Sequence, residues 1–362
     1  MDSGPNLQRQ YHFRQHQSRL EAIVERRKLI GFCCVTAVLG LTAAGTLAQA
    51  QSSFATRSMA ANLPAKPASN RAKPVSAPDG GSLLAATPGS LPDSAYLVRE
   101  VVYNELHDHD THGYWRYWVE RHVAKDTQLR EQVETPDGPV DRMELSNGRP
   151  LAPEAREQEE RRLRSLLNSS SEQAQHRKEY SEDEHRIGRI LALLPNAFLY
   201  EPAQQVGKSD GMPECPCYHM HFHPNPDFPA HSIEARIFHA MTGELWISED
   251  YKRLVRLDGK LQENVDFGYG ILGRLYKDGW FRLERTHVNA VGNIGGGDWK
   301  TQRLEVHMNG RAMLFKTIAR ETSEVRGGFT PVPSGLSLRQ AVVMTGEPRV
   351  VPPIQAAVVP AR

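Results

Sequence analysis

Thiol and imidazole side chains, which bind transition metals, are concentrated in one ten-residue segment of this sequence. Residues 214–223 read Glu-Cys-Pro-Cys-Tyr-His-Met-His-Phe-His. Successive residues of an extended strand face opposite sides, so the two cysteines and three histidines share one face. Tyr218, Met220 and Phe222 share the other face. The segment is therefore predicted to be a strand with one face of metal-ligand type and one apolar face.

A zinc or copper site is one interpretation of this strand, with Cys215, Cys217, His219 and His221 as the candidate ligands. The polar face spans about 26 Å, which is too long for a single ion whose ligands lie at about 2.0–2.3 Å. Only neighbouring pairs can share an ion, so further ligands must come from elsewhere. The candidates outside the strand are His107, Asp108, His109, His112, His231 and His239.

The alternative interpretation places the apolar face in a core and leaves the histidines on a solvated sheet face. In an oxidising compartment Cys215 and Cys217 could then form a disulfide. Their Cα atoms would be about 6.6 Å apart in a strand, near the upper limit of disulfide geometry. We adopt this second interpretation, under which no cofactor is expected, and keep the metal site as the alternative.

The composition favours a compact exported protein without affinity for nucleic acid. The 362 residues carry a net charge of +1 and are 39% hydrophobic, which gives no bulk charge for a nucleic-acid partner. Residues 29–48 form an apolar run after a basic group, and Ala48-Gln49-Ala50 is a small-x-small cleavage pattern. Residues 1–50 are therefore predicted to be a secretory signal peptide or, because the run is nearly long enough to span a bilayer, an uncleaved membrane anchor.

The domain organisation follows from composition. Residues 51–92 are rich in Ala, Pro and Ser, and residues 330–362 are poor in aromatic side chains. The first segment is therefore expected to be a disordered linker and the second a disordered tail. The folded domain is expected over 93–329. Export places it in the periplasm or cell envelope, attached to the inner membrane through residues 29–48 if the leader is retained.

Within this domain, hydrophobic periodicity predicts helices over 93–107, 153–168 and 172–194. Strands are predicted in an antiparallel meander near the start and in an up-and-down sheet near the end, with a turn at Asn309-Gly310. The expected strands are 114–125, 128–134, 140–145, 214–223, 244–248, 253–262, 269–276, 280–288, 301–307 and 312–319.

Signatures of common enzymes are missing from the sequence. It contains no His-Glu-x-x-His, no Gly-x-Ser-x-Gly and no Gly-x-Gly-x-x-Gly with an acidic partner. Gly207-Lys208-Ser209 ends like a phosphate-binding loop, but Pro202 stands where the leading glycine should be. We therefore expect a protein that is not an enzyme, with no catalytic residue assigned.

Three short patterns resemble the LolA-like family of periplasmic lipoprotein carriers, and most closely a bacterial outer-membrane lipoprotein-sorting-like set. They are Phe-His-Pro-Asn-Pro at 222–226, Gly-Glu-Leu-Trp-Ile at 243–247 and Phe-Gly-Tyr-Gly-Ile-Leu at 267–272. The resemblance implies an α+β fold: a strongly curved antiparallel sheet, or incomplete β-barrel, with helices packed on its concave side.

The resemblance also implies an apolar cavity that binds a lipid or a lipoprotein acyl chain, and partner proteins that load and unload it. Two alternatives stay open at this point. One is an envelope-stress sensor or regulator with a similar fold. The other is a metal-binding protein or metalloenzyme that uses the Cys/His strand.

Overall fold

The computed structural model of the chain describes residues 91–107, 113–123, 126–207, 216–267, 273–289, 297–312, 316–349 and 351, without the side chains of 312 and 316–320. The predicted leader at 1–50, the linker up to residue 90 and Cys215 lie outside these residues. Within the described part of the chain, no helix combines the length and the apolar character needed to cross a membrane.

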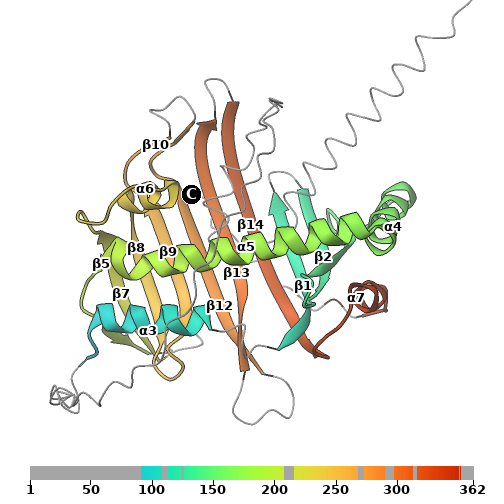
Figure 1. Cartoon of the computed structure of the whole chain (residues 1–362), viewed down its shortest axis with the longest axis horizontal. Helices are drawn as coiled ribbons and strands as arrows, with labels where there is room; N and C mark the ends of the chain where they lie inside the picture. The colour runs from blue at the N-terminus through green and yellow to red at the C-terminus, as the bar shows by residue number, and fades with distance from the viewer. Residues whose placement is uncertain are drawn as a thin grey trace, which may run out of the picture. The chain divides into compact units, whose positions relative to one another are not determined.

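The described residues form an α+β fold whose strands all belong to one open antiparallel sheet of 14 strands (Figure 1). The strand order is β4-β3-β2-β1-β14-β13-β12-β9-β8-β7-β5, while β6 pairs with β7 and the β10–β11 hairpin pairs with β13. The predicted antiparallel sheet is thus confirmed. The N-terminal meander comprises β1 (Tyr114–Val123), β2 (Asp126–Val133), β3 (Val140–Ser146) and β4 (Arg149–Pro150).

The larger part of the sheet follows the predicted up-and-down order from β7 to β14, apart from the β10–β11 hairpin. Its strands are β5 (Phe198–Tyr200), β6 (Gln204–Val206), β7 (Cys217–Pro224), β8 (Met241–Ser248), β9 (Leu254–Leu261), β10 (Val265–Phe267), β11 (Gly273–Leu275), β12 (Trp280–Asn289), β13 (Gly297–Ala312) and β14 (Lys316–Val332). The last strand pairs with β1, so the C-terminal strand joins the N-terminal meander to the rest of the sheet.

One prediction about this sheet is wrong. The expected turn at Asn309-Gly310 does not occur, because β13 continues to Ala312. Of the strand expected at 312–319, residue 312 ends β13, residues 316–319 belong to β14, and residues 313–315 lie outside the described part of the chain. Gly310 serves a different purpose there. A Cβ atom at this position would collide with the carbonyl oxygen of Arg274 in β11, so the glycine allows two strands to approach each other.

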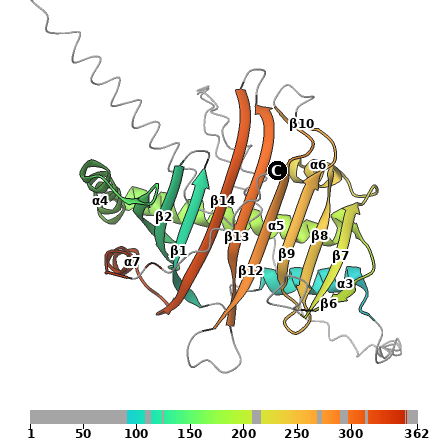
Figure 2. The same cartoon turned by 180° about the vertical axis from the view of Figure 1, so that it is seen from behind.

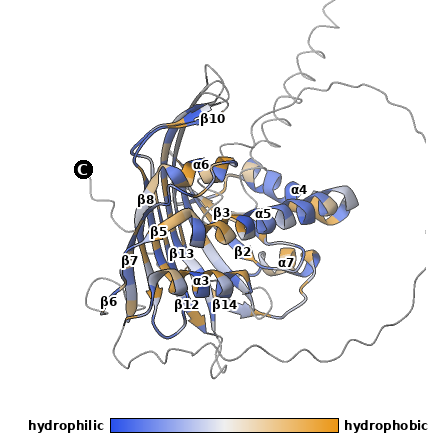
Figure 3. Cartoon of the chain, turned by 60° about the vertical axis from the view of Figure 1, so that its left-hand side comes forward, coloured by the Kyte–Doolittle hydropathy of each residue, from blue (hydrophilic) through white to orange (hydrophobic). Residues whose placement is uncertain are grey.

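Helices α3 (Ser94–Leu106), α5 (Ser170–Ala197) and α6 (Ile233–His239) lie on one side of the sheet. Figure 1 shows α3 and α5 in front of the strands, and in Figure 2 the same strands lie in front of the helices. Side chains of Asp93 and Ser169 cap the N-termini of α3 and α5. The side view in Figure 3 shows that α4 (Pro153–Asn168) and α5 are largely hydrophilic on their outer surfaces, as their charged sequences predict.

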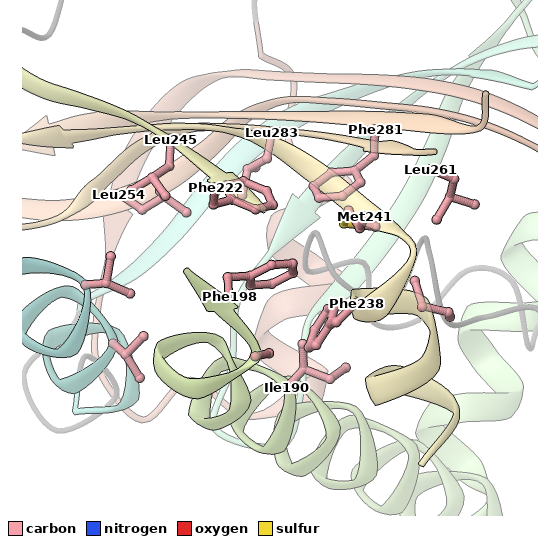
Figure 4. Close-up of a cluster of buried hydrophobic side chains, with 14 of the residues drawn as sticks. Ile190, Phe198, Phe222, Phe238, Met241, Leu245, Leu254, Leu261, Phe281 and Leu283 are labelled. Atoms are coloured by element: carbon pink, nitrogen blue, oxygen red, sulfur yellow. The ribbon is translucent and has the colours of Figure 1, made fainter. Parts of the chain in front are cut away.

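The main core lies between these helices and the sheet. On β7, Met220 and Phe222 are buried against it, while His219 and His221 are on the opposite face, so the predicted two-faced strand is confirmed. We call the face with Met220 and Phe222 the helix side and the face with His219 and His221 the histidine side. In Figure 4, side chains from the helix side of the sheet face Phe198, Phe238 and Ile190 across the core.

A second core corrects the predicted boundary of the domain. The folded region does not end at Phe329, because β14 runs to Val332 and helix α7 (Leu338–Met344) follows. A capping box between Ser337 and Gln340 starts α7. The helix buries Leu338, Ala341 and Val342 against α4, β2 and β3. The composition of this segment suggested a disordered tail. Its alanine and valine residues instead contribute to the apolar face of a short packed helix.

Candidate functional site

A cavity of about 1090 Å³ lies between α3 and α5 and the helix side of the sheet. This volume is slightly above the usual range for small-molecule sites, about 300–1,000 Å³. Its walls come from both halves of the sheet, from β1 and β2 as well as from β7 to β9 and β12 to β14. The cavity therefore depends on the long-range pairing of β1 with β14.

One end of the cavity is apolar. Helical spacing produces this lining, since α3 and α5 each place a valine, leucine or isoleucine stripe toward the sheet. The apolar lining residues are Val98, Val101, Val102, Leu106, Ile187, Ile190, Leu191, Leu194, Phe198, Phe222, Ile237, Phe238, Met241, Leu245, Ile247, Leu254, Leu257, Phe281 and Leu283. This wall can hold a hydrocarbon chain out of water.

Two phenylalanine rings cover two glycines in the sheet wall of this end. The register aligns Phe222 of β7, Gly243 of β8, Gly259 of β9 and Phe281 of β12 in one row. A Cβ on Gly243 would lie 2.6 Å from the Phe222 ring and closer still to the Asp258 backbone oxygen, and a Cβ on Gly259 would lie 2.8 Å from Cζ of Phe281. The rings lean inward over positions that must have no side chain.

We predict that Gly243→Ala lowers the free energy of unfolding by about 1–3 kcal/mol, because the new methyl group overpacks a wall of ring and backbone atoms. Urea unfolding followed by circular dichroism measures this change. Gly327→Ala is the matched control, since Gly327 also lies in a strand but a Cβ there would have no neighbour within 4 Å. If the two substitutions had equal effects, tight packing of the phenylalanine rings over Gly243 and Gly259 would not explain the loss of stability.

The other end of the cavity is lined by charged groups, of which Glu324 is the most buried, with 1% of its surface exposed. Its carboxylate accepts hydrogen bonds from Arg121 at 2.7 Å and from Arg326 at 2.7 Å. Burial by itself would raise the pKa of Glu324, but the charges of Arg326 and Arg121 lower it to about 2. The group is therefore a carboxylate held between two guanidinium ions at neutral pH.

Further ion pairs line the cavity. Lys300 contacts Glu134 at 2.9 Å, and Arg285 forms an ion pair with Glu105. Lys300 and Arg285 lie on β13 and β12, Glu134 directly follows β2, and Glu105 lies on α3, so these pairs tie the helix layer and both halves of the sheet together. The site is thus amphipathic, with a hydrocarbon end and a polar, ion-paired end. Single-sequence reasoning did not predict this polar end, since its partners lie on strands far apart in the chain.

The predicted metal ligands are only partly brought together. His219 and His221 lie beside Glu244 of β8, with His219 Nε2 at 3.0 Å and His221 Nδ1 at 3.8 Å from its carboxylate oxygens. Cys217 is fully buried and its sulfur takes part in a disulfide. The specific pairing of Cys217 with Cys215 stays a prediction.

The other candidate ligands do not join this cluster in the described part of the chain. Among the described residues, His107, His231 and His239 are not part of the group formed by His219, His221 and Glu244. The remaining candidates, Asp108, His109 and His112, lie outside the described residues. Sequence reasoning also missed Glu244. The alternation in Gly-Glu-Leu-Trp-Ile puts Glu244 on the histidine side, but only the strand register places it opposite His221.

The fold and the cavity define an α+β protein with an open antiparallel sheet and an amphipathic interior site. Comparison of the chain with protein-family models and with curated proteins finds no significant match.

Proposed function

We propose that this protein binds a lipid or a lipoprotein acyl chain in the cavity and that it is not an enzyme. The observation that carries the proposal is the two-ended lining, with an apolar end around Phe222 and Phe281 and an ion-paired end around Glu324. A lipid has the same two-ended character, because its hydrocarbon chain carries a polar head group. Each methylene group transferred from water into the apolar end contributes about 0.8 kcal/mol, so a long acyl chain can bind tightly without any strong polar contact.

We further propose that the sheet is the incomplete barrel of a LolA-like carrier, with α3 and α5 on its concave side. The order of strands β7-β8-β9-β12-β13-β14 and the helices on one face of the sheet support this assignment. In this arrangement α5 covers one side of the cavity, which its residues line from Arg177 to Leu194. The helix would move relative to the sheet when a ligand enters.

The proposed location is the periplasm or cell envelope, reached through the leader at residues 1–50. The apolar run at 29–48 and the cleavage pattern after it support export, and a retained leader would anchor the protein in the inner membrane. A carrier also needs one protein that loads it and another that receives its cargo. If the acyl chain is buried in the cavity, the loading protein and the receiving protein would both have to contact the side of the protein on which α5 lies.

Native mass spectrometry of the full chain, purified without denaturation from a bacterial host, tests the proposal. We expect an additional mass that organic extraction identifies as an acylated molecule, and uptake of a fluorescent fatty acid by the stripped protein. A protein that neither retains acylated molecules nor takes up the fluorescent fatty acid would refute lipid binding.

Gly188→Phe is predicted to weaken binding of the fluorescent fatty acid by more than about 10-fold. Gly188 lies on α5 and lines the cavity, where a Cβ would meet only Leu106, at 3.7 Å. A phenyl ring there would occupy the space of at least two methylene groups, and two of these contribute about 1.6 kcal/mol. Replacing a mid-helix glycine does not weaken the helix itself.

Ala192→Phe is the control for this variant, because Ala192 lies one turn further along α5 but is exposed and does not line the cavity. We expect unchanged affinity in a fluorescence titration of Ala192→Phe. Equal loss in both variants would point to a general effect on α5, and no loss in Gly188→Phe would place the ligand elsewhere.

A further inference from the structure

The geometry points to a binding site for a divalent transition-metal ion of the zinc type, formed by His219, His221 and Glu244 on the histidine side of the sheet. This site is separate from the cavity, since residues that alternate with these three on β7 and β8 line the helix side. The inference therefore does not depend on lipid binding.

Two strands supply the three ligands through ordinary sheet geometry. His219 and His221 are two residues apart on β7, so their imidazoles project from the same face, with ring centroids 5.0 Å apart. The antiparallel register places Glu244 of β8 directly opposite His221. A directly opposite pair brings side chains within about 5 Å, which is the range a shared ion needs.

The distances between the ligand atoms are close to those of an occupied site. One ligand atom from each residue lies within 4.8 Å of the other two. Ligands bound to a tetrahedral ion at about 2.0–2.1 Å lie about 3.3 Å apart. The observed distances, 3.0 Å from His219 Nε2 to Glu244 Oε2, which is a hydrogen bond in this structure, and 3.8 Å from His221 Nδ1 to Oε1, lie on either side of this value. Small side-chain rotations would complete the coordination without movement of the backbone.

Neighbouring side chains hold the first ligand in place. The His219 ring stacks on the indole of Trp246, with centroids 4.4 Å apart and an interplanar angle of 15°. The guanidinium of Arg256 covers the same indole at 4.7 Å. Arg256 is itself bound to Asp258 at 2.6 Å, so a carboxylate offsets its positive charge. Such orientation of a ligand is what raises the affinity of a metal site.

The ligand set selects the type of ion. Two imidazoles and one carboxylate suit zinc and its transition-metal neighbours, whereas calcium and magnesium prefer oxygen ligands alone. Three protein ligands leave one position of a tetrahedral ion open, and the 48% exposure of the His221 side chain and the 41% exposure of the Glu244 side chain direct that position toward solvent. Water or a group from a partner molecule can fill it.

Zinc titration of the full chain tests this inference. The protein, prepared without a polyhistidine tag and treated with chelator, is titrated with Zn²⁺ alone by isothermal calorimetry, and the affinity is measured by competition with a chromophoric chelator. We expect one strong site per chain and an affinity that falls at least about 10-fold in His221→Ala and in Glu244→Gln. Cobalt substitution should give the intense visible absorption of a four-coordinate ion.

His223→Ala is the matched control. His223 is the next residue on the same face of β7 but lies outside the three-residue group, so its removal should leave zinc affinity unchanged. Circular dichroism of each variant confirms that the sheet is intact, and His221 and Glu244 are exposed enough to be replaced without disturbing the core. Absence of a strong zinc site, or equal loss of affinity in His223→Ala, would overturn the assignment.

Discussion

Glu324→Gln is expected to lower the free energy of unfolding by about 3–5 kcal/mol. The substitution keeps the shape of the side chain but removes the negative charge between Arg121 and Arg326, both of which donate hydrogen bonds to it. Removing one member of a buried ion pair leaves the opposite charge buried without compensation, which costs far more than the pair contributes to stability. Two guanidinium groups are affected here, so the effect should exceed the loss of about 0.5–3 kcal/mol that most point substitutions cause.

The same carboxylate should make stability depend on acid pH. The pKa of Glu324 is about 2 in the folded state, below the value of about 4.3 for an unfolded glutamate. The folded state therefore binds this proton less readily, and its stabilising contribution is complete above the unfolded pKa. It is lost as the pH falls from about 4.3 toward 2. Glu324→Gln should lack this part of the acid-induced loss of stability.

Urea unfolding monitored by circular dichroism between pH 7 and pH 3 measures both effects. Glu321→Gln is the control, because Glu321 lies on the same strand but is exposed, and its substitution should change stability by less than about 0.5 kcal/mol. A Glu324→Gln protein as stable as the control at neutral pH would show that the carboxylate is not required between the arginines.

Leu338→Ala is the second prediction with a large effect, a loss of about 2–5 kcal/mol in the free energy of unfolding. Leu338 is 5% exposed in α7 and packs in the second core against α4 and β3. Truncating a buried leucine removes its hydrophobic contribution and leaves a cavity. The effect would be absent if residues beyond Phe329 were a disordered tail, so the measurement also tests the corrected boundary of the domain.

Val343→Ala provides a control within the same helix. Val343 is 62% exposed, so its truncation should change stability by less than about 0.5 kcal/mol. Thermal and urea unfolding of the two variants should therefore differ clearly. Similar small effects in both would mean that α7 does not contribute to the folded core.

The sequence was sufficient for features that depend on local periodicity. The stripe of Val98, Val101 and Val102 predicted the first helix, and the alternation of Met220 and Phe222 with histidines predicted a two-faced strand. These patterns are strong because burial of one face imposes a period of 3.6 residues on a helix and of 2 residues on a strand. The glycine at position 310 was misread, since glycine favours turns and close strand contacts equally.

Features that depend on strand register could not be predicted in the same way. Glu244 joins the histidines only because β8 is aligned with β7 so that it faces His221. The contact of Glu324 with Arg121 depends on the pairing of β14 with β1, which no local pattern indicates. A shift by one residue in either pairing would move these side chains to opposite faces of the sheet. Sequence reasoning therefore found the two histidines of the proposed metal site but not its glutamate.

The pairing of β1 with β14 also sets the order in which the chain can fold. Tyr114 at the start of β1 pairs with Val332 at the end of β14, so nearly the whole domain must be synthesised before this edge is closed. Until then the meander of β1 to β4 has an unpaired edge that other chains could bind. We expect slow folding dominated by this late, non-local step, and a requirement for protection of the nascent chain by chaperones until β14 is in place.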